Sequence, residues 1–375
     1  SGKTSLLNVC LVFIQPNHRV LTIEDSVSGE NEIIYQQDGK TCRATVGELI
    51  DSIVEDDSVL DCAIENDEGI QIPSVSPSGK VEWKEPSHFI RHRVAKDLLK
   101  VTLESGRTIE VTPDHSLFSL GENGKIAEIS GSELKEGSWL ATPRQVDWAG
   151  GKTVFNLKEH LNAFKGCFVK SLEIAPLIKE SWQKLSQTYN KGNLRASSRR
   201  NSASAEMVMS FSTIPETGWI SSRLGTKIPL QLEIDEDLAC VAGLWVADGS
   251  YDKNSVLVSI VEPEAREVVE RVAQRFGNKT KMHSDGITLM LNSKPLKQLF
   301  ENVLGLKGNA YTKSVPDWVF GLEKPLAAAF IKGYFSGDGW VRKNDIAVRS
   351  SSKNILTGMQ TLLLRFGIPL RVKWK

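Results

Sequence analysis

LACVAGLWVADGS at Leu238–Ser250 and LAAAFIKGYFSGDGW at Leu326–Trp340 are two versions of one pattern. Each is an apolar run with small residues, in which a Gly precedes an Asp by five positions and another Gly follows that Asp directly. The two aspartates, Asp248 and Asp338, are 90 positions apart. A repeat of this kind brings two carboxylates together by symmetry, and it indicates the fold of the second half of the chain.

Both runs predict helices, because their apolar residues recur at helical spacing. Asp235 is a suitable N-cap for the first helix, and Pro325 suits the first turn of the second. Gly243 and Gly333 are each followed four positions later by another small residue. Faces of small residues let two helix backbones approach closely, so we expect the two helices to pack together and to end side by side.

Asp248 and Asp338 would lie at the C-terminal ends of these helices, where Gly249 and Gly339 are expected to act as stops. The helix dipole disfavours an anion there by about 0.3–1 kcal/mol, and a second carboxylate nearby adds repulsion. A divalent cation such as Mg²⁺ would relieve both penalties. An Asp-Gly turn after a helix is common, so one copy would need no further explanation. Two copies with matched Gly spacing favour a metal site.

These motifs resemble those of LAGLIDADG homing endonucleases, with Val241–Gly249 and Ile331–Gly339 in the nine motif positions. Neither copy is a consensus match, but both keep the Asp-Gly pair. The resemblance implies an α+β domain of two pseudo-symmetric repeats that sits over double-stranded DNA and cleaves it with Mg²⁺. Asp248 and Asp338 would be catalytic residues and metal ligands. Lys313 is the candidate for a catalytic lysine, by its proximity to the second motif.

A second, independent signature lies upstream, in ESGRTIEVTPDHSLFSL at Glu104–Leu120. Its alternating apolar residues predict two strands, which are separated by Thr112-Pro113-Asp114-His115. This block resembles the T-x-x-H block of Hint domains, the all-β fold of inteins. Ser26–Asp51 resembles the first intein block, and Leu134–Arg144 resembles the strand that closes the amino-terminal half of the domain.

The Hint resemblance implies autocatalytic protein splicing. The Ser26 hydroxyl would attack the carbonyl of Asp25 and convert the peptide bond into an ester. His115 would protonate or polarise the leaving nitrogen, and Thr112 would orient that group or hold the developing oxyanion. Serine is a weak nucleophile near neutral pH, so strain or a positioned base must assist Ser26.

The chain begins with SGKTSLLN, which resembles the end of a P-loop with Gly2, Lys3 and Thr4 in the nucleotide-binding positions. With the acidic TIED segment that ends at Asp25, it resembles a type II/IV secretion ATPase. We therefore expect residues 1–25 to be a fragment of the host protein, the extein. Inteins finish on His-Asn, which is absent from Arg365–Lys375, so we expect the C-terminal splicing residues to be missing from this chain.

Charge is divided unevenly along a chain whose net charge is zero. Residues 26–143 have a balance of −11, and residues 144–375 have a balance of +11. The basic half is where we expect DNA to bind. Asn190–Glu206 is predicted to be either a disordered linker or a DNA-contacting arm. Its arginines are the candidate DNA contacts: Arg195, Arg199 and Arg200.

The predicted organisation has four parts. Residues 1–25 are the host fragment and 26–144 the N-terminal half of the Hint domain. Residues 145–230 are a basic linker or DNA-recognition insert, and 231–375 the nuclease domain with an incomplete second repeat.

The five cysteines are scattered with no C-x-x-C, which argues against a zinc site or disulfide framework and favours the cytoplasm. There is no apolar run of membrane-spanning length. We expect a monomer whose partners are the host polypeptide and the double-stranded DNA of an intein-free host allele. Two alternatives stay open: a nuclease-dead DNA-binding or maturase-like module, and a secretion-type ATPase fragment with an inert insert.

Overall fold

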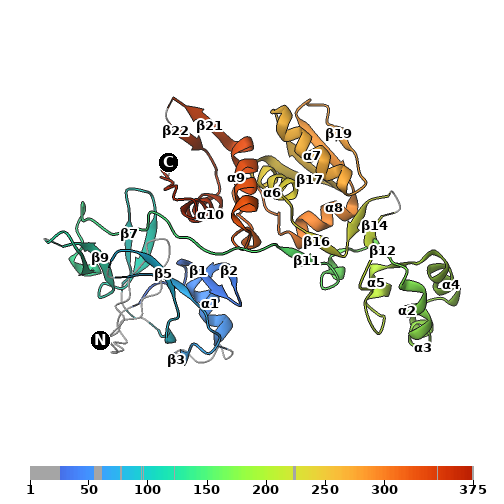
Figure 1. Ribbon diagram of the computed structural model, residues 1–375, viewed down its shortest axis with the longest axis horizontal. Helices are drawn as coiled ribbons and strands as arrows, with labels where there is room; N and C mark the ends of the chain where they lie inside the picture. The colour runs from blue at the N-terminus through green and yellow to red at the C-terminus, as the bar shows by residue number, and fades with distance from the viewer. Residues whose placement is uncertain are drawn as a thin grey trace. The chain divides into compact units, whose positions relative to one another are not determined.

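The computed structural model describes residues 26–54, 61–76, 78–93, 95, 97–121, 123–222, 225–343 and 345–373. Two compact units make up the chain (Figure 1). The first unit comprises Ser1–Gly151 together with Leu356–Lys375, and the second unit comprises Lys152–Ile355.

The first unit is built almost entirely from short antiparallel strand pairs, as the Hint resemblance predicts. The pairs are β1–β2, β3–β6, β4–β5, β7–β8 and β9–β10. The elements are β1 (Glu32–Gln37), β2 (Lys40–Thr45), α1 (Val46–Ile53), β3 (Cys62–Glu65), β4 (Ile72–Val75), β5 (Val81–Lys84), β6 (His88–Arg91), β7 (Leu99–Thr102), β8 (Thr108–Val111), β9 (Ser116–Leu120) and β10 (Ile126–Ser130).

The β1–β2 hairpin turns at Asp38-Gly39, and both residues have positive φ angles of 51° and 72°. An Asp-Gly pair in this conformation is the preferred two-residue hairpin turn, because its twist matches that of the strands. The chain then enters α1 through a capping box. The Thr45 hydroxyl accepts from the Glu48 N–H at 3.1 Å, and the Glu48 carboxylate accepts from the Thr45 N–H at 2.8 Å.

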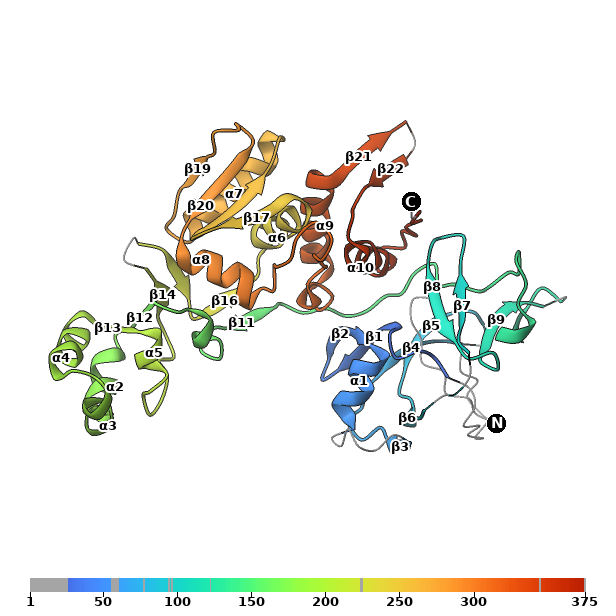
Figure 2. The same ribbon diagram turned by 180° about the vertical axis from the view of Figure 1, so that it is seen from behind.

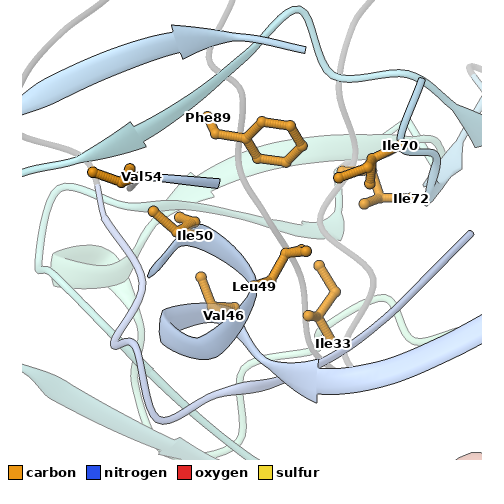
Figure 3. Packing of buried hydrophobic residues seen from close by; sticks show 8 residues of the cluster. All are labelled: Ile33, Val46, Leu49, Ile50, Val54, Ile70, Ile72 and Phe89. Carbon is orange, nitrogen blue, oxygen red and sulfur yellow. The ribbon is translucent and has the colours of Figure 1, made fainter. Parts of the chain in front are cut away.

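The core of the first unit lies between α1 and the neighbouring strands (Figure 3). Leu49 on α1 points toward Ile33 on β1, and Ile50 on α1 and Phe89 on β6 belong to the same cluster. These side chains are nearly inaccessible to water, so their burial is a main source of the unit's stability. The cluster also holds β6, whose end carries a residue of the candidate site described below.

The strands predicted around Thr112–His115 are confirmed as β8 and β9, with a tight turn between them. The strand predicted for Leu134–Arg144 is wrong, because these residues form turns and irregular backbone. The Ala141 N–H donates to the Phe118 carbonyl at 2.8 Å, but Pro143 has no N–H with which to extend a ladder.

The first unit also includes Leu356–Lys375, which contains most of α10 (Lys353–Leu364). The sequence analysis placed these residues in the nuclease domain instead. The Arg107 guanidinium donates to the Gln360 carbonyl, and the Val372 N–H donates to the Ser105 carbonyl at 2.8 Å. The buried Arg365 donates to the Trp148 carbonyl at 3.0 Å. These long-range contacts explain why the segment belongs to the first unit.

The second unit mixes helices and strands. Its elements are β11 (Val154–Asn156), β12 (Phe168–Lys170), α2 (Ile174–Glu180), α3 (Trp182–Thr188), α4 (Lys191–Arg200), β13 (Ser202–Ser204), α5 (Ala205–Val208), β14 (Trp219–Ser221), β15 (Lys227–Pro229), β16 (Gln231–Glu233), α6 (Glu236–Asp248), β17 (Gly249–Asp252), β18 (Ser255–Ser259), α7 (Pro263–Arg275), β19 (Thr280–Met282), β20 (Thr288–Asn292), α8 (Lys294–Gln298), α9 (Lys324–Asp338), β21 (Gly339–Arg342) and β22 (Asp345–Val348).

The element order of the two sequence repeats matches. In the first, α6 leads into the β17–β18 hairpin and α7, and β18 continues into a four-stranded sheet in the order β17-β18-β20-β19. In the second, α9 leads into the β21–β22 hairpin and α10. Figure 2 shows α6 and α9 side by side, with each hairpin starting at the end of its helix. In the second unit, α6 and α9 are thus each followed directly by a two-stranded hairpin.

The segment before the repeats is folded, so the disordered-linker alternative for Asn190–Glu206 is wrong. The Asn190 side chain caps α4 by accepting from the Gly192 N–H at 2.7 Å, and Leu194 is fully buried. The strands around these helices form a sheet in the order β13-β12-β14-β15. A cap and a buried leucine outweigh the polar composition that suggested disorder.

Candidate functional site

The first candidate site is the contact between Ser26 and Thr112. The Ser26 N–H donates to the Thr112 hydroxyl at 3.0 Å, and the Thr112 N–H donates to the Ser26 carbonyl at 2.9 Å. Val27 forms an antiparallel bridge with Val111 at the end of β8. The backbone nitrogen of Ser26 is therefore held by Thr112, a residue 86 positions away in the sequence.

Asn31 fastens the same segment from the other side. Its side-chain amide donates to the carbonyls of Ser28 and Glu110 at 3.0 and 2.8 Å, and its side-chain oxygen accepts from the Glu110 N–H at 3.1 Å. A side chain that bonds both polar groups of one backbone residue resists rotation of the segment. This role of Asn31 has no motif in the sequence and was not predicted.

His115 occupies the turn that follows Thr112. Its N–H donates to the Thr112 carbonyl at 3.0 Å, and its carbonyl accepts from the Gly131 N–H at 2.9 Å. The His115 side chain is 1% exposed. The predicted Thr112 and His115 therefore share one tight turn, and Thr112 bonds directly to Ser26.

One histidine at this site was missed by the sequence reasoning. The Ser26 hydroxyl and His92 Nε2 are 2.7 Å apart, within hydrogen-bonding distance. His92 directly follows β6 and lies between Arg91 and Arg93. A short basic stretch of this kind is typical of a solvent-exposed surface and gives no sign of a catalytic residue. No spacing signal links positions 26 and 92, so only the folded arrangement of strands reveals the pair.

The second candidate site lies where α6 and α9 end. These helices touch through their backbones: a Cβ at Gly243 would overlap the Phe330 carbonyl oxygen, and one at Gly333 would overlap that of Cys240. The predicted close packing is confirmed. Gly249 and Gly339 do follow the helices, but with φ near −90° rather than in the left-handed conformation of a common glycine stop.

Space explains these two glycines instead. A Cβ at Gly249 would overlap the Trp245 ring, and one at Gly339 would overlap the Phe335 carbonyl oxygen. Each glycine lets its helix turn at once into a strand, β17 or β21, while the preceding aspartate stays at the helix end.

The carboxylates of Asp248 and Asp338 influence each other electrostatically. Burial, and then repulsion from Asp248, raises the pKa of Asp338 to about 6, although Lys313 and the nearby Tyr334 hydroxyl oppose the rise. Asp248 is exposed and Asp338 is half-buried, so the pair is asymmetric. Two neighbouring anions at helix C-termini are the electrostatic situation that a cation would relieve.

Lys313 stands beside this pair, as its place in the sequence suggested. Its ammonium group donates to the carbonyls of Trp245 and Gly249 at 2.9 and 2.7 Å, and lies 4.6 Å from the centre of the Trp245 ring. Burial lowers the pKa of Lys313, while Asp248 and Asp338 raise it. The lysine thus caps the last turn of α6 and places a positive charge near both aspartates.

The donor set suits Mg²⁺ better than a softer metal. Within the described ranges no group of three or more His, Cys, Asp or Glu side chains could enclose a metal ion. Mg²⁺ commonly binds one or two carboxylates and takes its remaining ligands from water and substrate phosphates. Asp248, which is exposed, and Asp338, which is half-buried, could supply two such carboxylates.

The sequence pattern of the intein splicing domain matches residues 33–353, which is most of the chain. This chain belongs to the intein splicing domain family. Protein splicing is the activity of that family.

Curated relatives support the family assignment. The intein is 27% identical over 422 aligned positions to a DNA polymerase of Thermococcus kodakarensis, covering 91% of the intein and 25% of the polymerase. It is 25% identical over 359 positions to the DNA-directed RNA polymerase subunit Rpo1C of Methanocaldococcus jannaschii, covering 92% and 36%. The chain thus spans between a quarter and just over a third of the length of these relatives.

Solved inteins also match. A crystal structure of an intein from a hyperthermophile is 27% identical, with a TM-score of 0.28, and the match covers 30% of this chain and 69% of the other. A solution structure of the Pab PolII intein is also 27% identical, with a TM-score of 0.25, covering 30% and 62%.

The arginines predicted to contact DNA lie on α4, apart from the elements that carry the aspartates. Arg195 and Arg199 line a groove between α2 and α4 with Lys179 and Trp182, and its volume is about 1030 Å³. Arg200 is the last residue of α4 and is exposed. A groove with three cations and an indole ring has the chemistry that nucleic acids bind.

Several predicted features lie outside the described residues. These are Gly2, Lys3 and Thr4, which were expected to bind nucleotide, and Asp25, the residue before Ser26. Among the residues that are described, no helix has both the length and the apolar character needed to span a membrane.

Proposed function

We propose that this intein combines two activities, ester formation at the Asp25–Ser26 junction and site-specific, Mg²⁺-dependent cleavage of double-stranded DNA. The observation that carries the first is the bond from the Ser26 N–H to the Thr112 hydroxyl. The meeting of Asp248 and Asp338 beside Lys313 carries the second. The host polypeptide and an intein-free host allele would be the respective substrates.

In the first activity, the Ser26 hydroxyl attacks the carbonyl carbon of Asp25. Thr112 holds the N–H of the scissile bond, so the nitrogen that must leave is already oriented. His115, buried in the adjoining turn, supplies a proton to that nitrogen as the C–N bond breaks. The product is an ester of Asp25 on the Ser26 oxygen and a free amine on Ser26.

Hydroxylamine tests this step, because it cleaves esters and would release residues 1–25. Release from the natural chain and none from Ser26→Ala supports the proposal. Ser28→Ala is a matched control on the same segment and should release normally. Equal release from Ser26→Ala would contradict the role of Ser26.

In the second activity, Asp248 and Asp338 would hold Mg²⁺ for cleavage of DNA. The ion would activate water and stabilise the leaving oxygen of the phosphodiester. Lys313 keeps a positive charge beside the carboxylates and limits their mutual repulsion. Phosphate contacts from the basic half of the chain position the DNA, and the groove at Arg195, Arg199 and Trp182 is the proposed additional contact.

A plasmid that carries the intein-free host sequence is the substrate for the nuclease test. Asp248→Asn and Asp338→Asn should each reduce Mg²⁺-dependent cleavage at least about 100-fold and leave DNA binding intact. Asp252→Asn, an exposed aspartate at the end of β17, is the matched control and should cut normally. Binding by the natural chain with no cleavage in Mg²⁺ would select the nuclease-dead or maturase-like alternative.

The identity of the host is a further part of the proposal. SGKTSLLN and TIED support a secretion-type P-loop ATPase interrupted after Asp25, in the cytoplasm, with the intein acting as a monomer. ATP hydrolysis by this chain, lost in Lys3→Ala, would instead favour the reading of an ATPase fragment with an inert insert.

A further inference from the structure

The hydrogen bond between the Ser26 hydroxyl and His92 Nε2, at 2.7 Å, has no part in the scheme above. Thr112 bonds to the nitrogen of Ser26, whereas His92 bonds to its oxygen. Both Ser26 and His92 are half-buried, so the bond is partly shielded from competing water. The two interactions act on the two atoms that exchange the acyl group.

The backbone on either side of His92 is anchored. β6 pairs with β3 through Arg91 and Cys62, and Phe89 on β6 is buried in the core of the first unit. The Arg91 guanidinium donates to Asp51 at 2.8 Å. On the other side, the Arg93 N–H donates to the Asp61 carboxylate at 3.0 Å. The imidazole is therefore attached to a fixed backbone position rather than to a free loop.

A serine hydroxyl near neutral pH needs a base to become a useful nucleophile. Imidazole is the side chain best suited to accept a proton in that range, and 2.7 Å lies within the distance required of a general base. We propose that His92 is the general base that activates Ser26 for attack on the preceding carbonyl. This inference rests on the ester-forming activity proposed above.

The protons balance as follows. As the Ser26 oxygen bonds to the carbonyl carbon of residue 25, its proton passes to His92 Nε2. The C–N bond then breaks, its electron pair stays on the Ser26 nitrogen, and that nitrogen takes a proton from His115. Both imidazoles return to their starting state by exchange with water, so the step consumes no other reactant.

If His92 acts as the base and His115 as the acid, the need for His92 should depend on whether position 26 is serine or cysteine. A thiol ionises at a pKa of about 8.5, so a cysteine at position 26 supplies its own anion and has little need of His92. The nitrogen still has to be protonated, so the need for His115 is unchanged.

The experiment measures the rate at which hydroxylamine releases residues 1–25 from the full chain. His92→Ala and the shape-conserving His92→Gln should each slow release about 10²–10⁴-fold when Ser26 is present. In the Ser26→Cys background the same substitutions should slow release less than about 10-fold. His115→Ala should slow release in both backgrounds. His88→Ala, which changes a half-buried histidine at the start of β6, is the matched control and should change neither rate.

Normal release from His92→Ala with Ser26 present would overturn the inference and leave the proposed function standing. An equal loss in the Ser26 and Cys backgrounds would also overturn it, because it would mean that His92 only supports the fold. If neither the natural chain nor Ser26→Cys released residues 1–25, the proposed ester formation itself would fail, and the role of His92 with it.

Discussion

Asp338 is a side chain whose charge is unfavourable for folding. In the folded protein its pKa is about 6 against an ordinary value of 3.8, chiefly because burial and Asp248 disfavour its charge. The folded state therefore binds this proton more tightly than the unfolded state. The stability associated with the bound proton is fully present below about pH 4 and is lost as the pH rises through 6.

Asp338→Asn should raise the free energy of unfolding at pH 7 by about 1–2 kcal/mol, because it removes a carboxylate that is ionised at a cost. The gain should disappear near pH 4, where the natural side chain is already neutral. Urea unfolding at both pH values checks this. A loss of stability at pH 7 would mean that Asp338 has a stabilising partner. Cleavage that needs Mg²⁺ should conversely fall as the pH drops below 6, because protons then compete with the ion.

At the scale of elements, the pairing of α6 with α9 depends on glycines where the backbones meet. Gly333 leaves no room for a side chain against the Cys240 carbonyl, and Gly243 leaves none against that of Phe330. The backbone of one helix is rigid, so the only way to admit a methyl group is to move the helices apart. That movement would also displace Asp248 and Asp338, which end the two helices.

Gly333→Ala should therefore destabilise the second unit by about 3 kcal/mol or more, although alanine favours helices. Ala328→Gly is the matched control: it changes an exposed residue of the same helix, and it should cost only about 1 kcal/mol. Thermal unfolding of both variants distinguishes packing from propensity. If Gly333→Ala stabilised the unit, the helices would have to be less closely packed than the structure has them.

At the scale of the whole molecule, charge and chemistry divide along the chain. The acidic residues 26–143 lie in the first unit with Ser26, Thr112 and His115, and the basic region includes the second unit with both aspartates. The two proposed reactions thus use separate sets of residues. Variants in one set should have no effect on the reaction of the other.

We expect Ser26→Ala to cut DNA at the natural rate and Asp248→Asn to form the Ser26 ester at the natural rate. Residues far apart and without shared partners contribute independently. Plasmid cleavage and hydroxylamine release, measured on both variants and on the double variant, check this. If Ser26→Ala lost DNA cleavage, or if Asp248→Asn lost ester formation, the two reactions would be coupled.

DNA binding should depend on salt through the basic residues. Changing Arg195, Arg199 and Arg200 together to alanine should weaken binding and reduce the slope of log affinity against log salt by about 2–3, since each phosphate contact contributes about 0.9. Replacing Lys40, Lys80 and Lys100 of the first unit, all exposed, removes the same charge as a control and should leave the slope unchanged. An unchanged slope for the arginine variant would exclude the groove at α4 from the DNA contact.

Local patterns along the chain were enough to place the helices that end at Asp248 and Asp338 and the strands around Thr112 and His115. The contact of Ser26 with Thr112, 86 positions apart, was expected only from the resemblance to Hint domains. Helical periodicity, alternation and turn residues act over a few positions, so they can be read without the fold. The resemblance to Hint domains failed at Leu134–Arg144, where the expected strand is replaced by turns and irregular backbone. Local patterns failed at Asn190–Glu206, where polar composition hid a capped helix with a buried leucine.

The bond of His92 to Ser26, the brace at Asn31, and the burial of Lys313 beside the aspartates required the folded chain. Each joins residues tens of positions apart through a pairing of strands or a packing of helices that no local pattern encodes. Gly249 and Gly339 were expected as left-handed helix stops, but the structure requires glycine there because a side chain would overlap the preceding turn. Short-range periodicity determines which residues form a helix or a strand. Which side chains contact each other depends on how those helices and strands pack in the folded chain.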